Sequence, residues 1–161
     1  RIPLYSCCNT CLLDVRGRDV SIWHSTPTVE EVNRVNPGTM MGHLGIEFTE
    51  IGDNHLCASM PVDERTKQPM GLLHGGASVV LAETLGSAAS MLTLNPKTHF
   101  CVGLEINANH IRSARSGRVY GRSEPIHIGR STQVWEIRIE DEEQRLVCLS
   151  RITMSVLEVR A

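Results

Sequence analysis

The sequence predicts an α+β fold in which an antiparallel sheet lies against one long apolar helix. Three observations support this. Residues 77–92 contain no proline and a single charged residue, Glu83. Four segments after residue 99 alternate apolar with polar residues, as strands with one buried face do. Two shorter alternating segments precede the helix and are joined by the turn residues 52–54. One helix followed by a run of hairpin-connected strands is typical of the α+β class.

The N-terminal half predicts a short helix and a hairpin. Residues 1–20 show no sustained period, and we treat them as an N-terminal extension to one domain over residues 21–161. Thr28 and Glu31 have the spacing of a capping box, which starts a helix reaching to about Val35. A break at residues 36–38 follows. The predicted hairpin has its strands and turn at residues 44–51, 52–54 and 55–62.

The central helix follows a loop that contains Gln68, Pro69 and Gly71 and tightens at residues 74–76. Ala, Ser, Val and Leu dominate from there to Leu92, which favours a helix. Apolar and small residues occur all round it, so we expect burial on most sides.

Four longer strands complete the predicted sheet after a break at residues 95–97. They occupy residues 100–111, 117–127, 132–140 and 145–157. In the first of them, one face is expected to carry Val102, Leu104, Ile106 and Ala108. In the third, the apolar face carries Trp135, Ile137 and Ile139.

Composition excludes several classes of function. The chain has 161 residues, a formal net charge of −2 and a pI near 6.4, so it offers no general basic field for nucleic acid. No apolar run reaches the roughly twenty residues that span a bilayer. Residues 1–20 do not resemble a signal peptide, and we expect a cytoplasmic protein.

The six cysteines do not form a zinc-binding pattern in the sequence. Cys7, Cys8 and Cys11 cluster near the start, but no second ligand pair follows at zinc spacing. The other three fall singly in strands and are interpreted as small core residues of a reducing compartment: Cys57, Cys101 and Cys148. No metal site is predicted.

Glu83 is the one residue of the helix that packing does not explain. A buried carboxylate is costly unless it is paired, and such groups mark functional sites. The alternative is a structural carboxylate with a buried partner or at a subunit interface. Gly75 and Gly76 leave N–H groups accessible at the positive end of the helix, which suits an oxyanion. Together with Gln68 and His74, these groups suit acyl transfer.

The same residues resemble a known family. Residues 68–69, 71–77 and 82–83 (QP, GLLHGGA and AE) are similar to the PaaI-type acyl-CoA thioesterases of the hotdog fold. The likeness runs from about residue 22 to residue 157. It implies a sheet wrapped around one long central helix. Within the family, residues 65–69 and 103–115 look most like the hydrolases of 1,4-dihydroxy-2-naphthoyl-CoA in menaquinone biosynthesis. The proofreading thioesterases of enterobactin synthesis match residues 103–115 less well.

The resemblance implies a role for each matching position. Glu83 is the catalytic carboxylate, acting as nucleophile or as general base on water. The Gly75 N–H polarises the thioester carbonyl, while Gln68 and His74 hold the acyl group and the attacking water. Met70 stands where the family leads us to expect an aromatic residue. Substrate binding falls to Ser87, Gly103, His110, Ile111, Arg112, Ser113, His127, Ile128, Gly129, Arg130, Ser131 and Thr132.

Physical chemistry is consistent with part of this assignment. Arg112 and Arg130 are suitable partners for the phosphates of coenzyme A, and Gly129 allows close backbone approach. The alternative for both arginines is ordinary surface solvation. The resemblance also implies a homo-oligomer, usually a dimer of dimers, with sites between paired subunits and acyl-CoA as the substrate. No metal or organic cofactor is required.

Three functional hypotheses follow from the sequence. The first is hydrolysis of an aromatic acyl-CoA, of hydroxynaphthoyl or benzoyl type. The second is proofreading of aryl groups misloaded on a carrier protein, with a basic surface near Arg112 and Arg115 facing an acidic partner. The third is an acyl-CoA-binding hotdog protein without catalysis, which Glu83 and the adjoining glycines disfavour.

Overall fold

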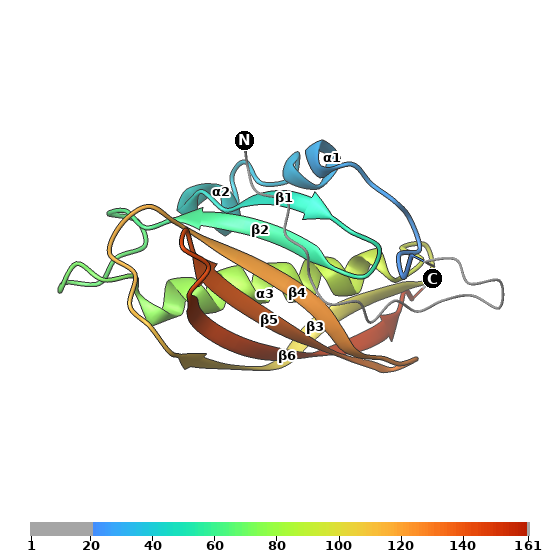
Figure 1. Ribbon diagram of the computed structural model, residues 1–161. Coiled ribbons are helices and arrows are strands. Elements are labelled where there is room, and N and C mark those ends of the chain that lie inside the picture. The colour runs from blue at the N-terminus through green and yellow to red at the C-terminus, as the bar shows by residue number, and fades with distance from the viewer. Residues whose placement is uncertain (1–20, 161) are drawn as a thin grey trace.

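The computed structural model describes residues 21–160, so the predicted extension over residues 1–20 lies outside the described part of the chain. A six-stranded antiparallel sheet curves around one long helix, α3 (Figure 1). The predicted α+β hotdog fold is therefore confirmed. The elements are α1 (Val29–Asn33), α2 (Met40–Leu44), β1 (Glu47–Ile51), β2 (Leu56–Pro61), α3 (Gly75–Leu92), β3 (His99–His110), β4 (Arg118–Ile128), β5 (Thr132–Asp141) and β6 (Leu146–Glu158).

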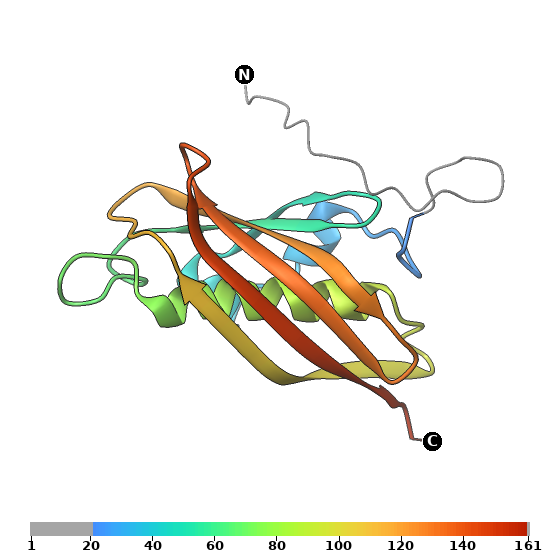
Figure 2. The ribbon, with the colours of Figure 1, turned by 60° about the horizontal axis from the view of Figure 1, so that its bottom comes forward.

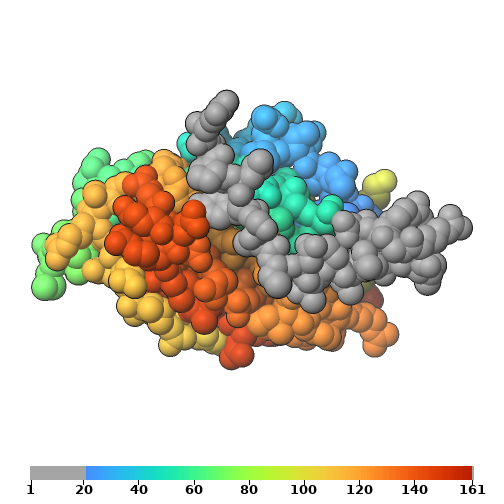
Figure 3. Space-filling model, in the orientation of Figure 1, coloured from blue at the N-terminus to red at the C-terminus, as the bar shows by residue number. Residues whose placement is uncertain are grey.

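The sheet has the strand order β1-β2-β4-β5-β6-β3, so β1 and β3 are its two edges. Figure 2 shows β3 running along one margin with α3 behind the sheet. Strands of the second half of the chain form much of the face seen in Figure 3. Among the helices of residues 21–160, none is long and apolar enough to cross a bilayer.

The short N-terminal helices differ in part from the prediction. The capping box is confirmed, because Thr28 Oγ1 accepts from the Glu31 N–H and the Glu31 carboxylate accepts from the Thr28 N–H. The helix ends at Asn33, two residues earlier than expected. A strand from residue 44 is wrong, because Leu44 closes α2. The Thr39 hydroxyl caps the start of α2, and Gly45 ends it in the left-handed region with φ 69°.

Helix α3 is buried on one side rather than on most sides. Its buried residues form a stripe that faces the sheet: Ala77, Ser78, Leu81, Ala82, Leu85, Gly86, Ala89 and Ser90. The opposite side, including Glu83, is only half-buried. The apolar residues all round α3 therefore leave a helix face that the described chain does not cover.

The expected single apolar face of β3 is broken by a β-bulge. Gly103 pairs with Met154 and Glu105 with Thr153, which leaves Leu104 as the extra residue. A bulge reverses the alternation of side chains beyond it. Ile106 and Ala108 consequently pack on the core, whereas Val102 and Leu104 are 42% and 63% exposed.

The core lies between α3 and the concave face of the sheet. The predicted face of β5 is confirmed, since Trp135, Ile137 and Ile139 are fully buried. A buried polar group continues this face, because Gln133 Oε1 accepts from the Ser90 hydroxyl at 2.7 Å and from Trp135 Nε1 at 3.1 Å. These bonds tie the C-terminal half of α3 to the sheet.

Candidate active site

Glu83 extends from the open side of α3 towards β3. The Ser87 hydroxyl, one helical turn later, donates to Glu83 Oε1 at 3.0 Å. On the β3 side, a Cβ atom added at Gly103 would lie only 2.9 Å from the same oxygen. The bulge places Gly103 with its inner side facing α3, so the carboxylate can approach the β3 backbone. Ser87 and Gly103 together fix where the carboxylate sits.

The N-terminus of α3 leaves one backbone donor available. His74 is the N-cap, and its Nδ1 accepts from the Gly76 N–H at 2.8 Å. Within residues 21–160, the Gly75 N–H donates to no protein atom. His110, at the end of β3, lies beside it, since a Cβ at Gly75 would be 2.7 Å from His110 Nε2. A helix N-terminus with a free N–H is suited to polarising a carbonyl oxygen.

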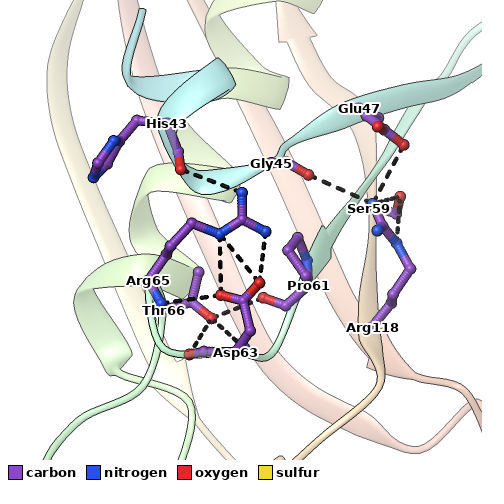
Figure 4. A network of polar contacts seen from close by, with 9 residues as sticks. All are labelled: His43, Gly45, Glu47, Ser59, Pro61, Asp63, Arg65, Thr66 and Arg118. Atoms are coloured by element: carbon purple, nitrogen blue, oxygen red, sulfur yellow. Dashed lines mark hydrogen bonds and ion pairs between the residues drawn. The ribbon is translucent and has the colours of Figure 1, made fainter.

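A network of polar contacts holds the loop that leads to α3 (Figure 4). Arg65 pairs with Asp63 at 2.5 Å and also reaches the His43 carbonyl at the end of α2. The hydrogen bonds from Arg65 lower the pKa of Asp63. Thr66 donates its hydroxyl to the Pro61 carbonyl at 2.8 Å, and its own carbonyl accepts from the His74 N–H at 2.8 Å. The N-cap of α3 is therefore anchored to β2 and α2.

Gln68 forms its hydrogen bonds within the turn of residues 68–72. Its Oε1 accepts from the Met70 N–H, and its backbone N–H and carbonyl bond Leu72 and Gly71. Among the described residues, no contact between Gln68 and Glu83 is recorded. The predicted role of Gln68 in holding the acyl group stays a prediction.

A shallow hollow of about 380 Å³ opens beside Glu83. Its walls are mostly apolar, as is usual for sites that bind small organic groups. Sequence reasoning had missed most of its lining because α2 was not expected and the α3 face was taken to be buried. Together with Glu83 and Ser87, the lining consists of Met40, Val79, Val80 and Thr84.

Within one chain, the Glu83 carboxylate and the Gly75 N–H do not lie close enough to act together. Gly75 and Glu83 are eight residues apart on α3, which is about 12 Å along a helix that rises 1.5 Å per residue. A carbonyl oxygen on the Gly75 N–H must lie about 3 Å from it, and the attacking group must be equally close to the carbonyl carbon. Glu83 and Gly75 of the same chain are too far apart to act on the same thioester.

The two predicted coenzyme A segments are likewise separated. Residues 110–113 lie at the end of the sheet where His110 pairs with Cys148, and residues 127–132 lie at the other end, where Thr132 pairs with Ser155. Seven residues of β6 separate these positions, which is roughly 23 Å. Arg112 and Arg130 are both exposed.

Comparisons with known proteins agree with the fold. A family model described as the thioesterase superfamily matches residues 70–148, which include α3, β3, β4, β5 and the start of β6. The 1,4-dihydroxy-2-naphthoyl-CoA hydrolase of Escherichia coli strain K12 is 56% identical over 136 residues, covering 84% of this chain and 99% of that protein. The proofreading thioesterase EntH of Cronobacter turicensis is 51% identical over 136 residues, covering 84% and 98%.

A solved structure gives the same result. The crystal structure of a mutant of thioesterase PA1618 from Pseudomonas aeruginosa superposes with a TM-score of 0.85 at 50% identity, over 86% of this chain and all of that one. Fold, sequence identity and coverage agree for these relatives. The chain therefore belongs to the thioesterase superfamily and is a hotdog-fold thioester hydrolase of the group that includes the 1,4-dihydroxy-2-naphthoyl-CoA hydrolase and EntH.

Proposed function

We propose that this enzyme hydrolyses an aromatic acyl-CoA to the free acid and coenzyme A, with 1,4-dihydroxy-2-naphthoyl-CoA as the first candidate and menaquinone biosynthesis as its setting. The observation that carries the proposal is the Glu83 carboxylate, held by Ser87 at the edge of an apolar hollow. The identity of 56% to a hydrolase of that substrate supports the choice of acyl group.

Glu83 supplies the attack on the thioester. Since Ser87 donates to Oε1, the lone pairs of Oε2 are available to accept a proton from water or to attack the carbonyl carbon. In the first route, water adds and its proton passes to Glu83. In the second, an acyl-enzyme anhydride forms and water then hydrolyses it. Coenzyme A leaves as a thiolate in both routes.

The oxyanion is stabilised at the N-terminus of α3. The Gly75 N–H and the positive end of the helix face the developing charge, and one such donor contributes about 3 kcal/mol in other enzymes. His74 keeps the first turn of α3 formed by accepting from the neighbouring Gly76 N–H. His110 flanks the same donor.

The site is proposed to form between two copies of the chain. Glu83 of one protomer then acts on a thioester held by Gly75 of its partner, which resolves the 12 Å separation. The edge strand β3 is the surface proposed for pairing, because it exposes Phe100, Val102 and Leu104. Antiparallel pairing of two β3 strands about a two-fold axis sets residues 110–113 of one chain at the same end as residues 127–132 of the other. Such dimers pair further into a tetramer.

The experiment that tests the substrate is steady-state release of free thiol from a small panel. The panel holds 1,4-dihydroxy-2-naphthoyl-CoA or a stable hydroxynaphthoyl analogue, benzoyl-CoA, a long-chain acyl-CoA and an aryl-loaded carrier protein. The proposal predicts the highest kcat/KM for the naphthoyl or benzoyl thioester. A preference for the loaded carrier protein would move the enzyme to proofreading, which the 51% identity to EntH keeps as the second candidate.

Sedimentation tests the proposed assembly separately. The active species is expected to be a dimer or a tetramer. A monomer with full activity would contradict a site shared between chains.

A further inference from the structure

Three side chains with different metal-binding chemistry meet on the β1–β2 hairpin. Glu50 is paired with Cys57 across the two strands, and His55 precedes Cys57 by two residues, so it projects from the same face. One ligand atom from each of the three lies within 4.8 Å of the other two. Leu56 and Ala58, which precede and follow Cys57, are fully buried, so the cluster occupies the outer face of the sheet, away from α3.

The surroundings of His55 resemble those of a metal-binding imidazole. Its Nε2 lies 3.0 Å from Glu50 Oε1, and its Nδ1 lies 3.4 Å from Asn54 Oδ1. Both oxygens are acceptors, whereas a neutral imidazole carries a single N–H. With its proton on Nε2 the ring donates to Glu50. With its proton on Nδ1 it donates to Asn54, which orients the ring, and the Nε2 lone pair can bind a cation that the Glu50 carboxylate also coordinates.

The hairpin holds the imidazole in place before any ion arrives. The ring lies over Gly52, where an added Cβ would be 2.0 Å from His55 Cε1, so a larger residue at this position would displace the ring. The His55 side chain is 12% exposed. The Gly52 carbonyl accepts from Trp23 Nε1 at 2.6 Å, and its N–H donates to the His55 carbonyl at 2.9 Å. The turn that carries His55 is therefore fixed to the core.

The charges of the cluster suit a divalent ion. A Cys57 thiolate and the Glu50 carboxylate supply two negative charges, and the neighbouring Arg122, which bonds Glu124 at 2.8 and 3.0 Å, also hydrogen-bonds the Cys57 sulfur that an ion would take over. Burial raises the pKa of the Cys57 thiol to about 11, so without metal it is protonated at neutral pH. A metal ion displaces that proton when it binds the sulfur.

We propose that Glu50, His55 and Cys57 form a zinc site that fastens the edge strand β1 to β2. Imidazole, thiolate and carboxylate together favour Zn²⁺, with water in the fourth position on the exposed Glu50 side. Zinc–ligand bonds of about 2.0 to 2.3 Å space tetrahedral ligands by roughly 3.5 Å. The three ligand atoms lie within 4.8 Å of one another, and His55 Nε2 and Glu50 Oε1 are 3.0 Å apart, so side-chain rotation adjusts each separation towards this spacing. Binding releases one proton from Cys57.

The experiment measures zinc binding by the full-length chain and requires no thioester substrate. A background variant with Cys7, Cys8 and Cys11 changed to Ser removes the thiols outside the described residues. Calorimetric titration with zinc chloride is expected to give one ion per chain. Cobalt(II) in place of zinc is expected to give the charge-transfer absorption of a cobalt–thiolate bond.

Cys57→Ser and His55→Gln provide the decisive comparison. Each should weaken zinc binding about tenfold or more, and Cys57→Ser should abolish the thiolate absorption. Cys101→Ser, which changes a half-buried thiol elsewhere, is the matched control and should bind zinc like the background. A hundredfold excess of zinc over Kd should raise the melting temperature of the background by about 5 °C or more. Absence of zinc binding, or equal affinity in all variants, would overturn the proposal and leave a plain His55–Glu50 ion pair.

Discussion

Replacing Gly103 by Ala tests whether the position of the Glu83 carboxylate controls turnover. The new Cβ would lie 2.9 Å from Glu83 Oε1, whereas an ordinary contact begins near 3.4 Å. The carboxylate must therefore retreat by about 0.5 Å or rotate away from Ser87, which donates to the same oxygen. A misplacement of about 1 Å in an active site can cost 100-fold in rate. We expect kcat to fall by about 10- to 100-fold.

The stability of the same variant should change little. The atom that must move is the free end of a flexible side chain, and Gly103 is not among the glycines with positive φ. A Gly→Ala change at a compatible position contributes about 0.4–1 kcal/mol through the unfolded state, which offsets the new contact. We therefore expect a melting temperature within a few degrees of wild type.

The assay is thiol release from benzoyl-CoA at saturating substrate, alongside thermal unfolding and sedimentation of the same samples. A loss of kcat in a folded protein of unchanged assembly is the predicted result. A kcat within twofold of wild type would refute the inference that Gly103 sets the position of the carboxylate. A lost oligomer would instead assign the effect to β3 pairing.

Three further predictions concern the neighbours of this site and the stability of the sheet. Ser87→Ala removes the hydroxyl that orients Glu83. Its hydrogen bond to the carboxylate is worth about 1.5–3 kcal/mol, so kcat should fall at least tenfold. Steady-state kinetics measures this, and an unchanged kcat would exclude an orienting role for Ser87. Gly86→Ala places a Cβ 2.3 Å from Ile152 Cγ2, so overpacking should lower the free energy of unfolding by about 1–3 kcal/mol. Urea denaturation measures this free energy, and a value equal to that of the wild type would show that α3 can move away from the sheet. The pKa of Cys57 is raised to about 11 from an ordinary 9.0, so the folded state keeps the thiol proton to a higher pH than the unfolded state does. The stability present below pH 9 should therefore fall by up to about 3 kcal/mol as the pH rises towards 11. Unfolding measured at pH 8 and 11 in the presence of a chelator should show a smaller loss in Cys57→Ser, and equal losses would contradict the raised pKa of Cys57.

Much of the fold could be predicted because its signals are local. The capping box at Thr28, the alternation along β5 and the run of α3 with its single charge each depend on neighbours in the sequence. Helix α2 also has local signals, the Thr39 cap and the left-handed Gly45, but its last residue, Leu44, was assigned to a strand and residues 40–43 to no element. Its absence from the prediction removed Met40 from the expected site.

Features set by long-range pairing could not be predicted from residue patterns. The bulge at Leu104 depends on the register of β3 against β6, and it decides which residues face α3. Glu83 was identified from its chemistry, the adjoining glycines and the family resemblance, whereas its contact with Gly103 and the approach of His110 to Gly75 require the folded sheet. The half-buried face of α3 could not be predicted either. An apolar helix face has the same sequence pattern whether its own chain or a partner chain covers it.

Turnover by Glu83→Gln is the most direct test of the proposed mechanism. The amide keeps the size of the side chain and can still accept from the Ser87 hydroxyl, but it cannot take a proton from water or attack a thioester. With benzoyl-CoA or a hydroxynaphthoyl thioester, we expect kcat to fall by about a thousandfold while the melting temperature and the oligomer stay as in wild type. Hydrolysis at a near wild-type rate would contradict the assignment of Glu83 as the group that attacks the thioester or activates water.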